Sequence, residues 1–309
     1  DQQTNMGVPK KGGKYMSVYK TPEGKRLIHE ACSEIYSQWP IPVISRQLET
    51  EEFGETFCLD MGPRDGAPLL LLHGSSSNSA AWMGYAPKWA EVFRVIALDI
   101  PGQPGLSDEN RPSLSDGSMK RWLESVVDRL HLLFQSEKNN QSESNSLFVC
   151  GMSLGSWIAL DYCLEHPDSI KGLCLITTSG IVPPKSAFFL RILPLLFLGK
   201  WGVKRINRLV HGNVPVDPEV EAFSLLTARW YRQLQEPLPI FSDKQLAGIS
   251  FPLLFIGGSA DVMIDTKATA ERLSRQVPEA QIVVLEGSGH VILDQGERIM
   301  NFFDAVFDS

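Results

Sequence analysis

The stretch Leu147-Phe148-Val149-Cys150-Gly151-Met152-Ser153-Leu154-Gly155-Ser156 decides the fold of this chain of 309 residues. It is an apolar run that ends in Gly-x-Ser-x-Gly, and a segment with helical spacing follows at 157–164. Strand, sharp turn and helix are the context in which this motif makes a nucleophile elbow, because the turn lifts the central side chain above the sheet. The residues two positions away must be small, and both are Gly. Ser153 is therefore predicted to be a nucleophile.

Apolar runs of strand length alternate with helical patterns on both sides of this stretch. The run at 69–72 consists of four leucines, which is typical of a strand buried on both faces of a parallel sheet. Further strands are predicted at 43–50, 55–61, 93–99, 170–177, 251–256 and 281–285, and helices at 82–92, 116–135, 266–276 and 297–307. This alternation predicts the α/β class, with a mostly parallel central sheet and helices on both faces.

Residues 181–248 interrupt the alternation. They are rich in proline, aromatic and aliphatic residues at helical spacing, so a helical cap insertion is predicted there. The core is then expected to comprise 42–180 and 249–309. Before it, residues 1–16 are polar and rich in Gly and Lys, as in a flexible arm, and 17–41 form an N-terminal helical extension whose role stays open.

Composition limits the classes of partner. The net charge is −7 and no long basic run occurs, which argues against nucleic acid or an anionic membrane as the main partner. The most apolar stretch, 187–199, contains Arg191 and Pro194 and is too short to span a bilayer. The five cysteines are odd in number and widely spaced and form no Cys-x-x-Cys pair, which disfavours a disulfide framework or a zinc site. A cytoplasmic location is the simplest expectation.

Polar residues follow the predicted strands where the carboxyl ends of a parallel sheet should meet. A serine needs a histidine to take its proton and a carboxylate to orient that histidine. Ser153, Asp261 and His290 occur in the chain order expected for such a triad on a hydrolase sheet. Asp265 is the alternative acid, but it lies at the start of a predicted helix, where an acid serves as a cap.

Acyl transfer also needs donors for a developing oxyanion. One is expected to be the backbone N–H of Leu154, at the start of the predicted helix. The other should come from the loop after His73, from Ser75 or alternatively Ser76. His73 is expected to brace this loop, and Asp99 to hold its own loop through Asx-type hydrogen bonds.

With these residues in place, the chain resembles the α/β-hydrolase superfamily, as a carboxylesterase-like serine hydrolase with a helical cap. The resemblance covers residues 42–307 and rests on five motifs: His73-Gly74, the loop from Asp99 through Ser107, Gly151-Met-Ser-Leu-Gly155, Gly257-Gly-Ser-Ala-Asp261 and Gly287-Ser-Gly-His290. Gln103 stands where many relatives carry His, a departure expected to affect only loop packing.

The resemblance implies hydrolysis of a small-molecule carboxylic ester, of small or moderately apolar character, through an acyl-enzyme and with no cofactor or metal. It does not fix the bond that is cleaved, because this fold hosts many chemistries. A C–C bond hydrolase or a cofactor-free perhydrolase on the same triad is one alternative. A non-enzymatic small-molecule receptor or signalling protein that retains the triad is another. Neither the physiological substrate nor the oligomeric state can be derived from these residues.

Overall fold

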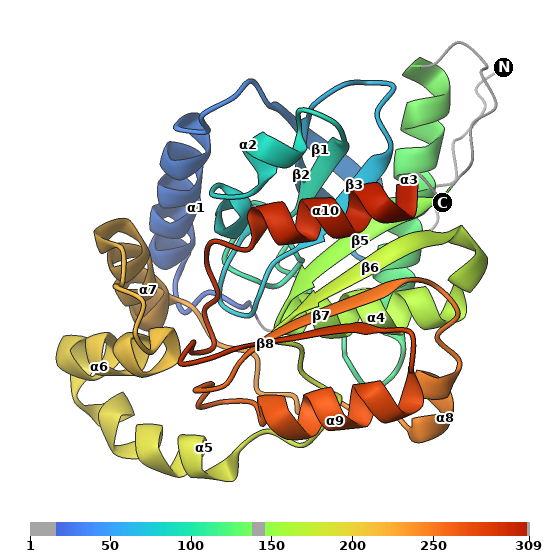
Figure 1. Cartoon of the computed structure of the whole chain (residues 1–309). Coiled ribbons are helices and arrows are strands. Elements are labelled where there is room, and N and C mark those ends of the chain that lie inside the picture. The colour runs from blue at the N-terminus through green and yellow to red at the C-terminus, as the bar shows by residue number, and fades with distance from the viewer. Residues whose placement is uncertain (1–16, 138–145, 308–309) are drawn as a thin grey trace, which may run out of the picture.

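The computed structural model describes residues 17–137 and 146–307, and its centre is an eight-stranded sheet (Figure 1). The strands are β1 (Ile44–Thr50), β2 (Gly54–Met61), β3 (Pro68–Leu72), β4 (Arg94–Leu98), β5 (Leu147–Met152), β6 (Ile170–Ile176), β7 (Leu253–Gly258) and β8 (Gln281–Leu285). Their order is β1-β2-β4-β3-β5-β6-β7-β8. The pairs β1–β2 and β2–β4 are antiparallel and the others are parallel. The predicted fold class is confirmed, whereas the expected arm at 1–16 lies outside the described residues.

Helices cover both faces of the sheet, because its central strands are apolar on both sides. One face packs against α3 (Ser118–Glu137), α4 (Leu154–Glu165), α8 (Asp243–Ala247) and α9 (Thr266–Gln276). The other packs against α1 (Pro22–Ser37), α2 (Ala86–Trp89) and α10 (Gly296–Phe307). Figure 1 shows α10 on one side of the sheet and α4 and α9 on the opposite side.

The predicted helix at 82–92 is wrong. A 3-10 turn, η1 (Ser79–Trp82), and the single-turn helix α2 stand in its place. Pro87 has no N–H to donate within a longer helix, and Gly84 weakens the segment before it. The chain turns instead through a tight hydrogen bond from the Tyr85 N–H to the Trp82 carbonyl at 2.9 Å.

Helix α1 is joined to the loops beside β3 and β4 through Asp99. Both oxygens of this buried carboxylate accept from the Tyr36 hydroxyl, at 2.7 and 2.9 Å. Oδ1 also accepts from the Ser79 N–H at 2.8 Å, and Oδ2 from the Leu106 N–H at 2.7 Å. The structure thus confirms that Asp99 holds its loop, and it shows one contact through which the N-terminal helix reaches the core.

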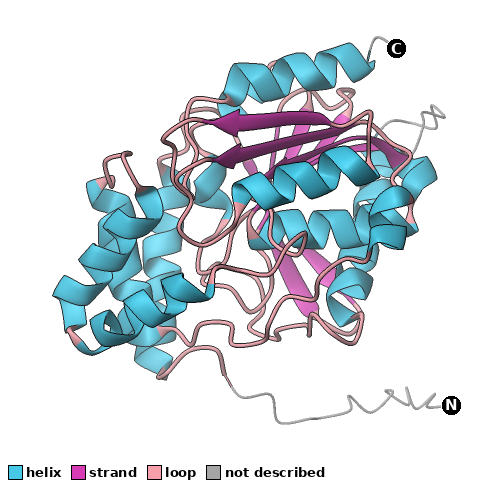
Figure 2. Ribbon diagram, turned by 60° about the horizontal axis from the view of Figure 1, so that its bottom comes forward, coloured by secondary structure: helices cyan, strands magenta, loops and turns pink. Residues whose placement is uncertain are grey.

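Between β6 and β7 the chain forms a helical insertion of α5 (Ser186–Ile192), η3 (Leu193–Phe197), α6 (Gly199–His211) and α7 (Pro218–Trp230), followed by α8. Figure 2 shows that strands of the sheet point toward this group of helices. Helix α7 packs against α1, where Gly24 lies so close to Trp230 that a Cβ on it would be 2.7 Å from the Trp230 Cβ. Within the described ranges, no helix has the length and apolar character that a membrane span requires.

Candidate active site

Ser153 lies at the turn between β5 and α4, with its backbone in a strained conformation of φ 50° and ψ −108°. Its N–H donates to the carbonyl of Ile176 on the neighbouring strand at 2.9 Å. Ser156 lies three residues later, in the first turn of α4, and its hydroxyl donates to the Gly151 carbonyl at 2.6 Å. Sheet and helix therefore fix the turn from both sides, and the strained backbone is the one that a nucleophile elbow requires.

Two glycines make this turn possible. A Cβ on Gly151 would lie 2.5 Å from the carbonyl oxygen of Gly155. A Cβ on Gly155 would overlap the carbonyl oxygen of Leu72 at the end of β3. Both clashes are with backbone, which cannot move aside as a flexible side chain can. The spacing of Gly-x-Ser-x-Gly is thus explained by the close approach of β3, β5 and α4.

The structure brings Ser153, His290 and Asp261 together, although 137 residues separate the first two. Ser153 Oγ lies 3.0 Å from His290 Nε2, and His290 Nδ1 lies 2.7 Å from Asp261 Oδ2. Asp261 follows β7, and His290 follows β8 in the loop that contains Gly289. These distances suit a proton relay from the hydroxyl to the imidazole, with the carboxylate orienting the ring.

Asp261 is buried and held as a carboxylate. Burial raises the pKa of this group, but the hydrogen bond from His290 and the N–H groups of Ile264 and Met263 outweigh burial, so its pKa lies below the ordinary value. The alternative acid, Asp265, instead accepts from the Ala268 N–H at 3.1 Å as the N-cap of α9. The geometry therefore places Asp261, and not Asp265, beside the histidine.

His73 is fully buried and joins two loops. Its Nδ1 lies 2.7 Å from the Gly74 carbonyl, and its Nε2 accepts from the Ile100 N–H at 3.0 Å. Burial lowers the pKa of the ring, which favours the neutral tautomer with the proton on Nδ1 that these partners require. The structure agrees with a bracing role for His73.

The loop after β3 contains Ser75 and Ser76, the two residues from which the second oxyanion donor was expected. The N–H of Ser76 is already engaged, because it donates to Gln103 Oε1 at 2.8 Å. Ser75 is exposed, and Leu154 is the first residue of α4, where helical N–H groups have no partner within the helix. Gln103 occupies the N–H of Ser76, so of the two serines the geometry favours Ser75 as the candidate donor.

The contribution of α6 was not predicted from the sequence. Its last residues lie on the loop of His290: the His290 N–H donates to the Val210 carbonyl at 3.0 Å, and Gly212 pairs with Ser288. Burial lowers the pKa of His211, and the nearby His290 lowers it further. No local pattern around 210 signals this contact, because it joins segments about 80 residues apart that meet only in the folded chain.

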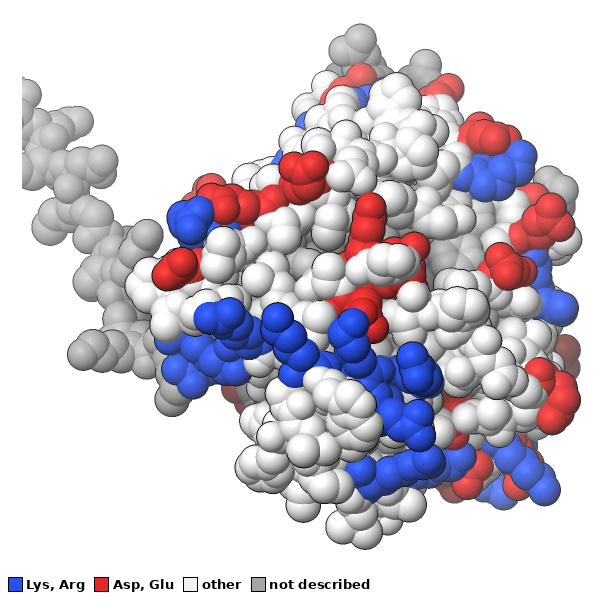
Figure 3. Space-filling model, turned by 90° about the vertical axis from the view of Figure 1, so that its left-hand side faces the viewer, with Lys and Arg blue, Asp and Glu red and all other residues white. Residues whose placement is uncertain are grey.

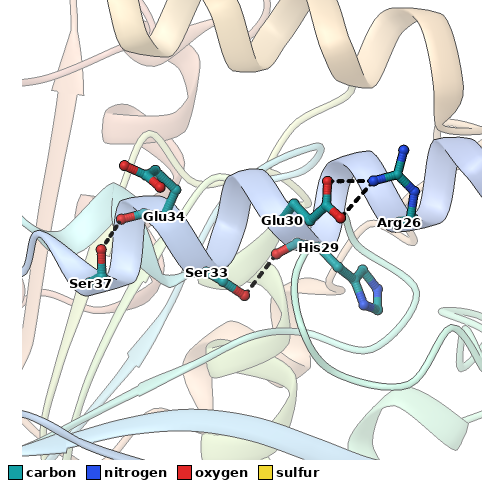
Figure 4. Close-up of a pocket in the computed structure, with 6 residues that line it drawn as sticks. All are labelled: Arg26, His29, Glu30, Ser33, Glu34 and Ser37. Carbon is teal, nitrogen blue, oxygen red and sulfur yellow. Dashed lines mark hydrogen bonds and ion pairs between the residues drawn. The ribbon is translucent and has the colours of Figure 1, made fainter.

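A shallow depression along α1 lies away from these residues (Figure 4). Its polar groups are paired with one another: Arg26 with Glu30 at 2.7 Å, and the Ser33 hydroxyl with the His29 carbonyl at 2.9 Å. It is therefore a solvated helix face. In the part of the chain that the structure describes, no group of three or more His, Cys, Asp or Glu side chains could hold a metal ion.

A serine, histidine and aspartate joined at the carboxyl ends of a mostly parallel sheet, in this chain order, is the arrangement of α/β-hydrolases. Residues 69–301 match the model of the alpha/beta hydrolase family, and the chain belongs to that family.

Similar proteins include esterases from Bacillus subtilis. The chain is 25% identical over 289 residues to the uncharacterized carboxylesterase nap of strain 168, with 90% of this chain and 92% of the relative covered. The crystal structure of carboxylesterase CesB (YbfK) has a TM-score of 0.78 at 22% identity, covering 93% of this chain and 98% of that one. Naproxen esterase has a TM-score of 0.78 at 23% identity, covering 94% and 99%. These two structures are similar in fold.

Proposed function

We propose that this protein is a serine esterase that cleaves carboxylic esters of small or moderately apolar molecules through an acyl-enzyme. The observation that carries the proposal is the continuous chain of contacts from Ser153 Oγ to His290 Nε2 at 3.0 Å and from His290 Nδ1 to Asp261 Oδ2 at 2.7 Å. Similarity to carboxylesterases over nine-tenths of the chain supports the choice of bond.

In the proposed mechanism, Ser153 Oγ attacks the ester carbonyl carbon while His290 takes the hydroxyl proton. The oxyanion is held by the N–H groups of Leu154 and Ser75, with the N-terminal end of α4 adding a favourable dipole. His290 then gives its proton to the departing alcohol. Water attacks the acyl-enzyme with His290 again as base, which releases the carboxylic acid and restores Ser153. Asp261 stays ionised and stabilises the imidazolium.

We also propose the division of the chain that fits this mechanism. Residues 42–180 and 249–309 form the hydrolase core, 181–248 form a cap, and 17–41 form an extension that supports the cap. Three contacts support it: the bond between His290 and Val210, the packing of α1 on α7, and the contact of Tyr36 with Asp99. The five cysteines are free and buried, which supports a reducing compartment such as the cytoplasm.

The test uses purified full-length protein and p-nitrophenyl esters of increasing acyl length, with Ser153→Ala as the control. We expect turnover by the wild type and a fall in kcat of about 10⁴-fold or more in the variant, because the nucleophile is lost. A fluorophosphonate probe should label the wild type and leave the folded variant unlabelled. Labelling of Ser153 without ester turnover would favour C–C hydrolysis or perhydrolysis. If the probe does not label the folded wild type, the alternative of a non-enzymatic small-molecule receptor is favoured.

A further inference from the structure

The start of the insertion exposes an unusual amount of apolar surface. Of the fifteen large hydrophobic side chains that are exposed among the described residues, seven lie within the thirteen positions from 189 to 201. These seven, which we call the apolar ridge, are Phe189, Leu190, Leu193, Leu196, Phe197, Leu198 and Trp201. Phe197 is 83% exposed and Leu190 is 73% exposed. Contiguous apolar surface of this kind marks an interaction site more often than scattered exposed side chains do.

Basic side chains lie close to the ridge in the sequence. Residues 185–216 contain six Lys or Arg and no Asp or Glu, although the whole chain has a net charge of −7. Five of the six are exposed: Arg191, Lys200, Lys204, Arg205 and Arg208. Lys204 pairs with Glu221 of α7 at 2.6 Å, which leaves the other four for an external partner. Figure 3 shows a band of Lys and Arg side chains beside a rounded, uncharged projection of the molecule. The negative net charge of the whole chain argues against an anionic partner, but residues 185–216 form a local surface of positive charge.

A second copy of the chain does not fit this surface. A symmetric dimer through 185–216 would bring the six cations of each copy to one interface without an acidic partner, because this segment contains no Asp or Glu. An anionic bilayer fits both the apolar ridge and the basic side chains beside it. Apolar side chains enter the boundary between headgroups and acyl chains, cations stay at the phosphates, and a Trp such as Trp201 prefers that boundary.

We propose that the apolar ridge and its basic band dock this protein peripherally on an anionic phospholipid surface. Helix α6 links the two sites: Lys200 and Trp201 lie in its first turn, and its last turn bonds to the loop of His290 through Val210. A docked molecule would therefore hold its insertion, and the active site beneath it, beside the lipid surface. The inference rests on the exposed residues and not on the proposed esterase chemistry.

The test is co-sedimentation of the full-length protein with vesicles of phosphatidylcholine, or of phosphatidylcholine with one quarter phosphatidylglycerol. We expect binding to the anionic vesicles that weakens as salt is added. Lys200→Gln/Arg205→Gln should weaken it about 25-fold, since each cation near the surface contributes about 1 kcal/mol. Leu190→Ser/Phe197→Ser should weaken it about tenfold or more. Leu132→Ser, a variant of an exposed residue on α3, is the matched control and should bind as the wild type does.

Turnover of a soluble short-chain ester should be the same in all these variants, which shows that they are folded and separates a failure of docking from a failure of the proposed function. Lack of binding to anionic vesicles would overturn the proposal. Binding that survives Leu190→Ser/Phe197→Ser would also overturn it. A third outcome would overturn it as well: light scattering detects a concentration-dependent dimer of the wild type that is absent in Leu190→Ser/Phe197→Ser, and neither protein binds vesicles.

Discussion

Gln103 Oε1 accepts the backbone N–H of Ser76 at 2.8 Å, and the hydroxyl of Tyr231 lies 3.2 Å from the same oxygen. One buried side chain therefore joins three parts of the molecule: the loop after β3, the loop after β4 and the end of α7. The sequence context of Gln103 predicts an effect on loop packing alone. Its contact with Ser76 places it next to the proposed oxyanion donor, so we assign it a positioning role.

Gln103→Met tests this role. The substitution keeps the volume but removes the acceptor, and a buried unpaired N–H costs about 1–3 kcal/mol. We expect kcat for a soluble ester to fall about tenfold or more because the Ser75 donor loses its fixed position, while KM changes little. Gln103→Glu keeps an acceptor oxygen and is the control, with kcat above that of the Met variant. Wild-type kcat in Gln103→Met would refute the assignment.

Asp261 and Asp265 form a matched pair for testing the acid. Asp261→Asn removes the charge that orients His290 and stabilises the imidazolium, and we expect kcat to fall about 10⁴-fold. Asp265→Asn removes only the charge of a helix cap, which Asn replaces well, so kcat should stay within a few-fold. Steady-state kinetics on one ester measures both. A comparable loss in the two variants would argue against the distinction.

The pKa of Asp261 also makes a prediction about acid conditions. Because its pKa lies below the ordinary value of 3.8, Asp261 is mostly ionised at any pH above that value. Protonation of Asp261 should therefore not contribute to any loss of kcat between pH 7 and pH 5. A pH profile of kcat in which Asp261→Asn removes a protonation step in that range would contradict this expectation.

Gly155 and Gly74 test the close approach at the elbow. Gly155→Ala would drive a Cβ into the carbonyl of Leu72, and we expect a loss of at least ~3 kcal/mol in the free energy of unfolding. At Gly74 the nearest atoms to an added Cβ are 3.7 Å away, an ordinary contact, so Gly74→Ala should leave stability nearly unchanged. Urea denaturation measures both variants. Equal stability of the two would show that β3 and α4 can separate.

A buried charge cluster at the start of β4 gives a prediction about stability and pH. Asp60 accepts from Arg94 at 2.7 Å, and both side chains are 1% exposed. Asp60→Asn would leave the Arg94 guanidinium paired only with the less buried Glu137, at 2.7 Å, and we expect a loss of about 3 kcal/mol at pH 7. Glu30→Gln breaks an exposed pair with Arg26 and is the control, with an effect of about 0–1 kcal/mol.

The sign of the pH effect follows from the pKa of Asp60. Burial raises this pKa, but the hydrogen bonds and charges of Arg94 and Arg46 outweigh burial and lower it from 3.8. The contribution of Asp60 is therefore complete above the unfolded value and is lost as the pH falls through the lower folded value. The difference between wild type and Asp60→Asn should shrink in urea titrations below pH 3.8. A difference that grows there would contradict the assignment.

Local patterns in the sequence were enough for the sheet and for the residues that meet at its edge. Ser153, Asp261 and His290 each follow an apolar strand, and parallel strands bring their carboxyl ends together whatever the loops between them do. The helix predicted at 82–92 does not form, although its apolar spacing is helical, because Pro87 interrupts the backbone hydrogen bonds. Periodicity reports which face is buried, whereas a missing N–H decides whether a helix can continue.

The contacts made by Gln103, Val210 and Asp60 could not be predicted in the same way. Each joins a residue to a partner on another element, and nothing in the neighbouring residues encodes which partner it meets. Asp60 lies within an apolar strand pattern, and the sequence does not show whether a single carboxylate in such a strand is buried or faces solvent. Only the fold shows that Arg94 approaches it.

The hydrogen bond from the His290 N–H to Val210 has a kinetic consequence. Any movement that lifts α6 away from the core must either break this bond or carry the His290 loop with it. If a bulky ester enters past α6, opening that path and keeping the imidazole aligned with Ser153 become competing states of one equilibrium. For bulky esters, the rate at which α6 returns to its contact with the His290 loop would limit kcat. The kcat of bulky esters would then depend on solvent viscosity, while that of small esters would not.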